Sequence, residues 1–265
     1  MHGRSLRNTW LRYALPVLGL WATATAVKAA DCPRPDTLGT SRVMVLDAAS
    51  TPRIGLKSFP QTLPLADKEV VLTFDDGPNP LTTKRVLTAL ANECVRATFF
   101  VIGQSAKAHP DLLKAMAAAG HTIGHHSWSH PNLARMPTAA AEDNIARGIA
   151  ADRLALNDNS GAAPATGFFR FPFFASTRTL LDDMQGLGLV VFGADLWASD
   201  WNPMQPAQEL ALITRRLQKA RKGIILFHDT KARTATMLPS FLHYLRDNGY
   251  HIVHVVPKLE EGTHD

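Results

Sequence analysis

The sequence predicts an α/β protein folded as a distorted (β/α) barrel, complete or incomplete, with about seven parallel strands. Short apolar segments typical of buried strands alternate with longer segments of helical pattern from residue 68 onward. Glycine occupies positions where a helix would hand over to a strand, at Gly120, Gly188, Gly223 and Gly249. This alternation favours a parallel sheet, and seven strands with six intervening helices suit a barrel better than an open sheet.

The first expected strand, Val70–Phe74, is a β-branched and aromatic run that ends in Asp75 and Asp76. Gly77 and Pro78 then turn the chain. The other strands are expected at Ala97–Ile102, His121–Gly124, Gly167–Phe171, Leu189–Ala194, Gly223–Phe227 and His251–Val255. The helices between them are expected at Leu81–Asn92, Gln104–Ala119, Thr138–Asn157, Ser176–Leu187, Ala207–Lys222 and Arg233–Asn248.

The first 29 residues have the pattern of a secretory signal peptide. Three arginines form a basic start, and the apolar stretch Tyr13–Val27 follows. That stretch is shorter than the ~20 residues of a membrane span, so we expect cleavage after Ala29 or Ala30. The mature protein would then be exported, to the periplasm or the medium, without a stable membrane span.

Composition narrows the remaining function classes. The formal charge of +5 nearly vanishes without residues 1–29, because these carry four basic residues and no acid and leave 24 basic residues against 23 acidic ones. We therefore expect no general basic surface for nucleic acid. In an oxidising compartment Cys32 and Cys94 could pair, and buried free thiols are the alternative.

Ionisable side chains follow five of the expected strands. They are Asp75 and Asp76, then His125, His126 and His130, then Arg170, then Asp195 and Asp200, and finally His228 and Asp229. Because the C-terminal ends of barrel strands meet on one face, and that face carries the chemistry, these residues predict a single site there.

His126 and His130 stand four residues apart. On one helical turn this spacing puts two imidazoles side by side, although a pair of surface histidines would look the same. One carboxylate of Asp75 and Asp76 would complete a three-ligand site of the catalytic zinc type. The other carboxylate would stay free as a base.

Five short motifs occur in order along the chain: TFDDG at 73–77, HSWSH at 126–130, RFPF at 170–173, DW at 200–201 and LFHD at 226–229. Through them the chain resembles the polysaccharide deacetylases of carbohydrate esterase family four, the group with the chitooligosaccharide deacetylase homology domain. The resemblance implies a catalytic domain at 67–258, between an N-terminal extension at 30–66 and a tail at 259–265.

The resemblance also implies roles for the residues of the first motifs. Asp76, His126 and His130 would hold the metal, zinc or another divalent ion. Asp75 would be the general base for the attacking water, and Arg170 would pair with it and orient it.

The later motifs would supply the acid and the pocket. His228 would be the general acid for the leaving amine, and Asp200 would tune it. Trp201 and Leu226 would line a small pocket for the acetyl methyl group, and the backbone N–H of Phe173 would face the oxyanion.

The chain departs from the family pattern at several positions. Phe173 and Phe174 stand where the family usually has tyrosine and glycine, and His125 stands where it often has asparagine. The roles of His125 and Asp195 stay open, and core packing is the preferred reading of Trp197.

The predicted function is metal-dependent N-deacetylation of an amino sugar polymer or oligomer, chitin-like or peptidoglycan, with release of acetate. Two alternatives keep the fold but change the substrate: removal of O-acetyl esters from xylan, and hydrolysis of small cyclic amides. A non-catalytic glycan-binding protein is a third alternative.

Overall fold

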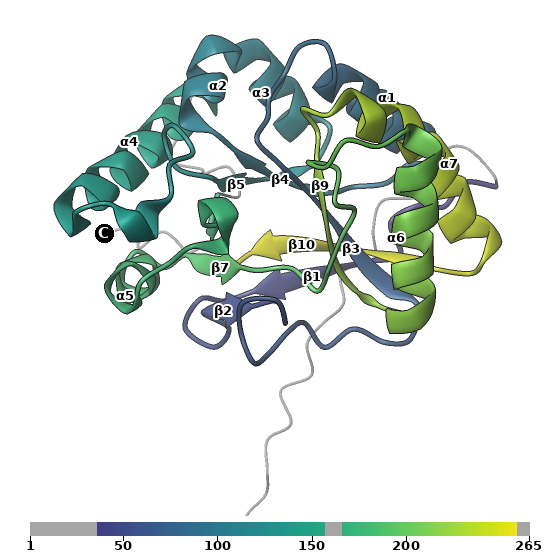
Figure 1. Cartoon of the computed structure of the whole chain (residues 1–265), viewed down its shortest axis with the longest axis horizontal. Coiled ribbons are helices and arrows are strands. Elements are labelled where there is room, and N and C mark those ends of the chain that lie inside the picture. Colours follow the sequence, from purple (N-terminus) through teal and green to yellow (C-terminus); the bar gives the residue numbers. More distant parts are fainter. Residues whose placement is uncertain (1–35, 157–165, 259–265) are drawn as a thin grey trace, which may run out of the picture.

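The structure is a computed structural model that describes residues 36–156 and 166–258. In that part of the chain ten strands form one sheet with helices around it (Figure 1). The strands are β1 (Arg42–Leu46), β2 (Arg53–Ile54), β3 (Glu69–Asp75), β4 (Thr98–Val101), β5 (Thr122–His125), β6 (Phe168–Phe169), β7 (Val190–Phe192), β8 (Leu196–Trp197), β9 (Gly223–His228) and β10 (His251–Pro257). The helices are α1 (Thr83–Asn92), α2 (Gly103–Ala108), α3 (Pro110–Ala118), α4 (Thr138–Leu156), α5 (Arg178–Gly186), α6 (Pro206–Ala220) and α7 (Ala232–Asp247), with 3-10 turns at Leu133–Arg135 and Pro172–Phe174.

All paired strands in the described residues are parallel. From β3 the sheet runs through β4, β5, β6 and β7 to β2 on one side, and through β9 to β8 on the other. The ladder between β2 and β8 is missing, so the barrel is not closed. β10 pairs with the first residues of β3 and continues along β1. Figure 1 shows β1 and β2 on the side of the sheet away from α2 and α3.

The seven expected strands are all present, as β3, β4, β5, β6, β7, β9 and β10, which confirms the α/β prediction. The helix expected over Gln104–Ala119 is two helices, because Pro110 starts a new one and cannot donate a backbone hydrogen bond to the turn before it. Three strands were not expected: β8, and β1 and β2 in the segment assigned to an N-terminal extension.

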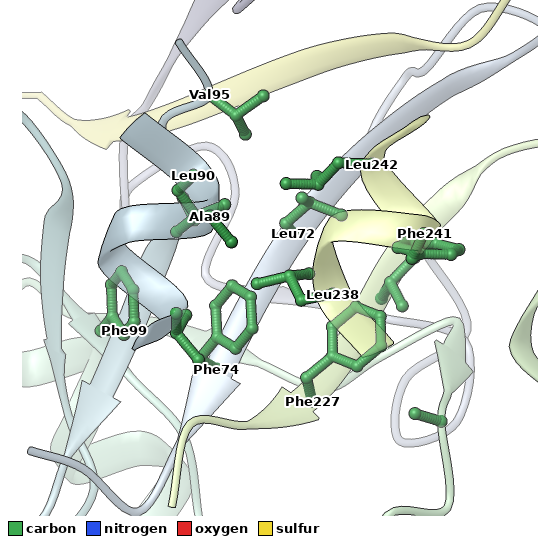
Figure 2. Packing of buried hydrophobic residues seen from close by; sticks show 14 of the residues in the cluster. Leu72, Phe74, Ala89, Leu90, Val95, Phe99, Phe227, Leu238, Phe241 and Leu242 are labelled. Carbon is green, nitrogen blue, oxygen red and sulfur yellow. The ribbon is translucent and has the colours of Figure 1, made fainter. Parts of the chain in front are cut away.

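Strand β3 separates two parts of the core by its alternation of side chains. Val70, Leu72 and Phe74 face the helices, where the Phe74 ring stacks between Phe99 and Phe227 at centroid distances of 5.1 and 5.5 Å (Figure 2). Val71 belongs to the cluster inside the barrel. Because side chains alternate along a strand, Thr73 and Asp75 face inward as Val71 does. The same apolar run that anchors the sheet therefore aims a carboxylate into the barrel.

Some expectations fall outside the described residues. These are the signal peptide at 1–29, the tail at 259–265 and Cys32, the expected partner of Cys94. Cys94 itself is not a free thiol. In residues 36–156 and 166–258 no helix is both long and apolar enough to span a membrane.

Candidate active site

Adjacent strands bring Asp75 and His228 to the same end of the barrel. The two residues are register partners at the C-terminal ends of β3 and β9, and Thr73 is paired with Leu226 two residues earlier. His228 shares its face of β9 with Leu226, since side chains repeat every second residue. Asp75 is buried, with 3% of its surface exposed, and His228 is half-buried.

Asp76, His126 and His130 form the metal-ligand cluster of the described residues. Asp76 Oδ1 lies 3.6 Å from His126 Nε2 and 3.3 Å from His130 Nε2, and no hydrogen-bond donor reaches this oxygen from the described residues. One ligand atom from each residue lies within 4.8 Å of the others. His126 donates from Nδ1 to the Arg170 carbonyl at 2.7 Å, which leaves Nε2 as the acceptor nitrogen. Burial lowers the pKa of His126 to about 3, so its ring is neutral, as a metal ligand must be.

The two histidines lie on a loop after β5, not on a helical turn. Ser127 and His130 have positive φ values of 66° and 58°, which no helix contains, and the Ser127 hydroxyl accepts from the His130 amide at 3.1 Å. The i, i+4 argument for their proximity was therefore wrong in its geometry. Their rings are nevertheless close, with centroids 4.9 Å apart.

Asp75 is held by the fully buried guanidinium of Arg170. The Arg170 Nη1 group donates to Asp75 Oδ1 at 2.7 Å and to Thr73 Oγ1 at 2.9 Å, and Nη2 donates to the Gly193 carbonyl at 2.8 Å. Burial raises the pKa of Asp75, whereas the charges of Arg170 and His228 lower it. Asp75 is thus a more basic carboxylate than an exposed one, fixed in one orientation.

His228 is held by Asp200 on the side away from the pocket. Its Nδ1 donates to Asp200 Oδ1 at 2.7 Å, and its backbone N–H donates to Asp200 Oδ2 at 2.6 Å. Burial alone lowers the pKa of His228, but the hydrogen bond and charge of Asp200, with smaller contributions from Asp75 and Asp76, raise it to about 9. The imidazole is therefore protonated at neutral pH and can act as a proton donor.

A cavity of about 560 Å³ lies over these groups, and its wall is largely aromatic. Phe173 is 64% exposed and packs against His130, while Trp201 is 46% exposed and packs against His228. Trp197 also lines the cavity and stacks on Phe174, so its assignment to the core was wrong. The remaining lining residues are Asp75, Asp76, His126, Phe171, Leu226 and Lys231. A larger cavity of about 1100 Å³ lies beside Gly167 and Pro257, at a distance along the fold from this chemistry.

The two residues whose roles were open lie outside this cavity. His125 is fully buried, and its Nδ1 lies 2.7 Å from Asp152 Oδ2 of α4. Asp195 accepts from the Leu56 amide, the Thr62 hydroxyl and the Ile224 amide, so it ties the segment after β2 to β9. Both are structural partners, and neither contacts the cluster of Asp76 with the two histidines.

Sequence reasoning missed several residues that contact the site. Thr73 donates no charge but fixes Arg170, and its position two before Asp75 on one strand face could have revealed it. Lys231 lines the cavity three residues after His228. Thr234 and Glu209 lie behind Asp200, and no local pattern marks them.

Comparison with known proteins gives consistent matches. A family model described as polysaccharide deacetylase matches residues 63–192. A peptidoglycan-N-acetylglucosamine deacetylase of Listeria monocytogenes is 33% identical over 189 residues, which are 71% of this chain and 38% of that protein. A chitooligosaccharide deacetylase of Sinorhizobium fredii is 35% identical over 161 residues, which are 60% of this chain and 71% of that protein.

Solved structures agree with the fold. A peptidoglycan deacetylase of Bdellovibrio bacteriovorus superposes with a TM-score of 0.73 at 28% identity, over 89% of this chain and 66% of that one. The chain thus spans less than half of the Listeria relative but most of the Sinorhizobium one. The motif residues, the incomplete parallel barrel and these matches together place the chain in the polysaccharide deacetylase family.

Proposed function

We propose that this protein is a metal-dependent hydrolase that removes N-acetyl groups from an amino sugar polymer or oligomer and releases acetate. One observation carries the proposal: Asp75 and His228, each paired with an oppositely charged residue, stand opposite one another beside a cluster of three metal-ligand side chains. A basic carboxylate and a protonated imidazole so placed can accept one proton and deliver another in the same reaction. The names of the Listeria and Sinorhizobium relatives agree with this reaction.

The chain's residues fit a zinc ion or another divalent metal. Asp76 would hold it together with His126 and His130, and this would give the buried Asp76 oxygen the partner that the described residues do not supply. When bound, such a metal would polarise the acetyl carbonyl and make water more acidic.

Asp75 would take the proton of the attacking water, whose oxygen adds to the acetyl carbon. Arg170 keeps the Asp75 carboxylate in one orientation throughout. The C–N bond then breaks, and His228 gives its proton to the leaving nitrogen, so the products are acetate and a free amine. The backbone N–H of Phe173 would donate to the carbonyl oxygen while negative charge develops on it.

The cavity also supports a choice of substrate class. Trp201 and Leu226 beside His228 give an apolar wall for the acetyl methyl group. Lys231 is the single lysine or arginine among the described residues that line the cavity, and it has no ion pair within them. A positive charge at this position favours an anionic glycan, so we propose peptidoglycan, which carries carboxylates, ahead of neutral chitin-like oligomers.

Two other substrate classes can be tested beside these. O-acetylated xylan would present an ester in place of the amide, and its alkoxide leaving group depends less on the proton from His228 than an amine does. A small cyclic amide would need only the inner part of the cavity of about 560 Å³. A purely glycan-binding role would leave the paired base and acid without use.

The test is acetate release by the zinc-loaded protein from peptidoglycan, chitooligosaccharides and acetylated xylan. Asp75→Asn should lower the rate by about 10²- to 10⁴-fold, because the base is lost, while the bound zinc stays near that of the wild type. Asp143→Asn, on the exposed face of α4, is the matched control and should leave the rate unchanged. A metal-loaded wild type that releases no acetate from any of the three substrates would refute the function.

The site of action would be outside the cytoplasm. We propose that residues 1–29 are a signal peptide that is removed on export to the periplasm or the medium, where a peptidoglycan substrate is accessible. Mass spectrometry of the exported protein, with an N-terminus at or next to residue 30, would support this, and an intact Met1 would contradict it.

A further inference from the structure

A buried acidic residue lies behind the His228 acid on helix α6. Glu209 is fully buried, which is unusual for a glutamate in the first turn of an amphipathic helix. Its Oε1 lies 2.8 Å from the hydroxyl of Thr234 on the neighbouring helix α7. Its other oxygen, Oε2, is buried and has no hydrogen-bond partner in the described part of the chain.

The Thr234 hydroxyl stands between two carboxylates. Its Oγ1 lies 2.9 Å from Asp200 Oδ2 and 2.8 Å from Glu209 Oε1. A hydroxyl has one proton to donate, so it can serve one of the two carboxylates, and the other contact needs a proton from the carboxyl group itself. One of the two acids is therefore protonated.

The surroundings decide which acid carries that proton. Asp200 already accepts from the His228 ring and from the His228 backbone N–H, and both donors stabilise a carboxylate. Glu209 has no such donor, and burial raises its pKa to about 7, with the charge of Asp200 adding to the increase and Arg233 and His228 opposing it. The chain of hydrogen bonds thus runs from Glu209 to Thr234, from Thr234 to Asp200, and from His228 to Asp200.

We propose that Glu209, in its protonated form, is a positioning residue for the His228 acid. Its carboxyl proton occupies the acceptor side of the Thr234 hydroxyl and turns the Thr234 proton toward Asp200. Asp200 then accepts from three donors, two on His228 and one on Thr234, which fixes the plane of its carboxylate against the imidazole. The catalytic consequence rests on the function proposed above, whereas the direction of these hydrogen bonds does not.

Loss of the Glu209 proton should weaken this arrangement. An ionised Glu209 draws the Thr234 proton to itself, so Asp200 loses a donor and the His228 ring is held less well for proton transfer. The groups that face Glu209 are Asp200, Arg233, Thr234 and His228, and none of them belongs to the metal-ligand cluster. The effect should appear in kcat and leave KM nearly unchanged, because substrate contacts are not altered.

The first measurement needs no substrate. Carbon-13 NMR of protein labelled at the glutamate carboxyl carbons, with Glu209→Gln to assign the signal, reports the ionisation of Glu209. We expect a midpoint near 7, whereas exposed Glu142 should titrate at about 4.3. A Glu209 midpoint below about 5 would overturn the proposal, because the residue would then be ionised in the working range.

The second measurement is the pH profile of kcat for acetate release. The amide of Glu209→Gln donates to Thr234 at every pH, so the ratio of its kcat to that of the wild type should rise by about threefold between pH 6 and pH 8. Thr234→Val removes the donor and should lower kcat about tenfold with KM within about twofold, and Thr234→Ser should restore it. Glu142→Gln, on the exposed face of α4, is the control and should follow the wild-type profile.

The outcomes separate the two proposals. Parallel pH profiles for Glu209→Gln and the wild type, or a Thr234→Val variant that loses thermal stability but keeps kcat, would overturn the positioning role while acetate release stands. A wild type without acetate release would refute the proposed function, and the NMR midpoint would still decide whether Glu209 is protonated.

Discussion

Asp200→Asn tests the assignment of His228 as the proton donor. Two opposing effects act on the pKa of His228: burial lowers it, and the hydrogen bond and charge of Asp200 raise it to about 9. Asparagine keeps the size of the side chain but removes the charge. The pKa of His228 should then fall to or below its ordinary value of about 6.5, because burial is no longer outweighed.

The size of the effect depends on pH in a predictable way. With a pKa near 9, about 90% of His228 is protonated at pH 8, whereas with a pKa near 6.5 only about 3% is. The fraction of active acid at pH 8 therefore drops by roughly 30-fold, while at pH 6 most of the imidazole is protonated in both proteins. The loss should thus be small in mild acid and grow as the pH rises.

The assay is kcat/KM for acetate release between pH 5.5 and pH 9.5, with both proteins at equal zinc content. This ratio reports ionisations of the free enzyme, so the alkaline limb follows His228. We expect the limb to move to lower pH by about two units in Asp200→Asn and to stay in place in Asp143→Asn. An alkaline limb that does not move in Asp200→Asn would mean that Asp200 does not set the acid, and the reasoning would be wrong.

Three further predictions concern the metal, the substrate and the core. His130→Ala removes one of three ligands and should weaken zinc binding by at least about 100-fold in a chelator competition titration; unchanged affinity would contradict the cluster. Lys231→Met should raise KM for peptidoglycan about fivefold and leave KM for chitooligosaccharides within about twofold; equal effects on both would argue against charge recognition. Phe74→Ala should lower the free energy of unfolding by about 3–5 kcal/mol in urea titrations, whereas exposed Phe173→Ala should change it by less than about 0.5 kcal/mol.

The strands could be predicted where their residues are numerous enough to show a pattern. β3 and β9 are long apolar runs, and both were placed within two residues of their ends. β2 and β8 contain two residues each, which is too short for any periodic signal. β1 is apolar, but it is a strand because β10 lies beside it, and that pairing joins segments more than 200 residues apart.

The site was predictable to the extent that local motifs encode it. The order of strand ends placed Asp75, Arg170 and His228 on one face without a structure. The loop of His126 and His130 was not predictable as a loop, because the same spacing also fits a helical turn. Glu209 could not be identified either, since a glutamate in the first turn of a helix is ordinary in sequence and only the packing of α6 on α7 buries it.

The two adjacent aspartates at the end of β3 show how one strand makes two different acids. Alternation turns Asp75 into the barrel, where Arg170 and Thr73 fix it. Asp76 follows with a positive φ of 78°, which takes its carboxylate out of the strand pattern and toward His126 and His130. A regular extension of the strand would have sent Asp76 to the helix side with Phe74, into an apolar cluster that cannot stabilise a charge. The left-handed residue therefore keeps both carboxylates at one cavity, where one can serve as base and the other as ligand.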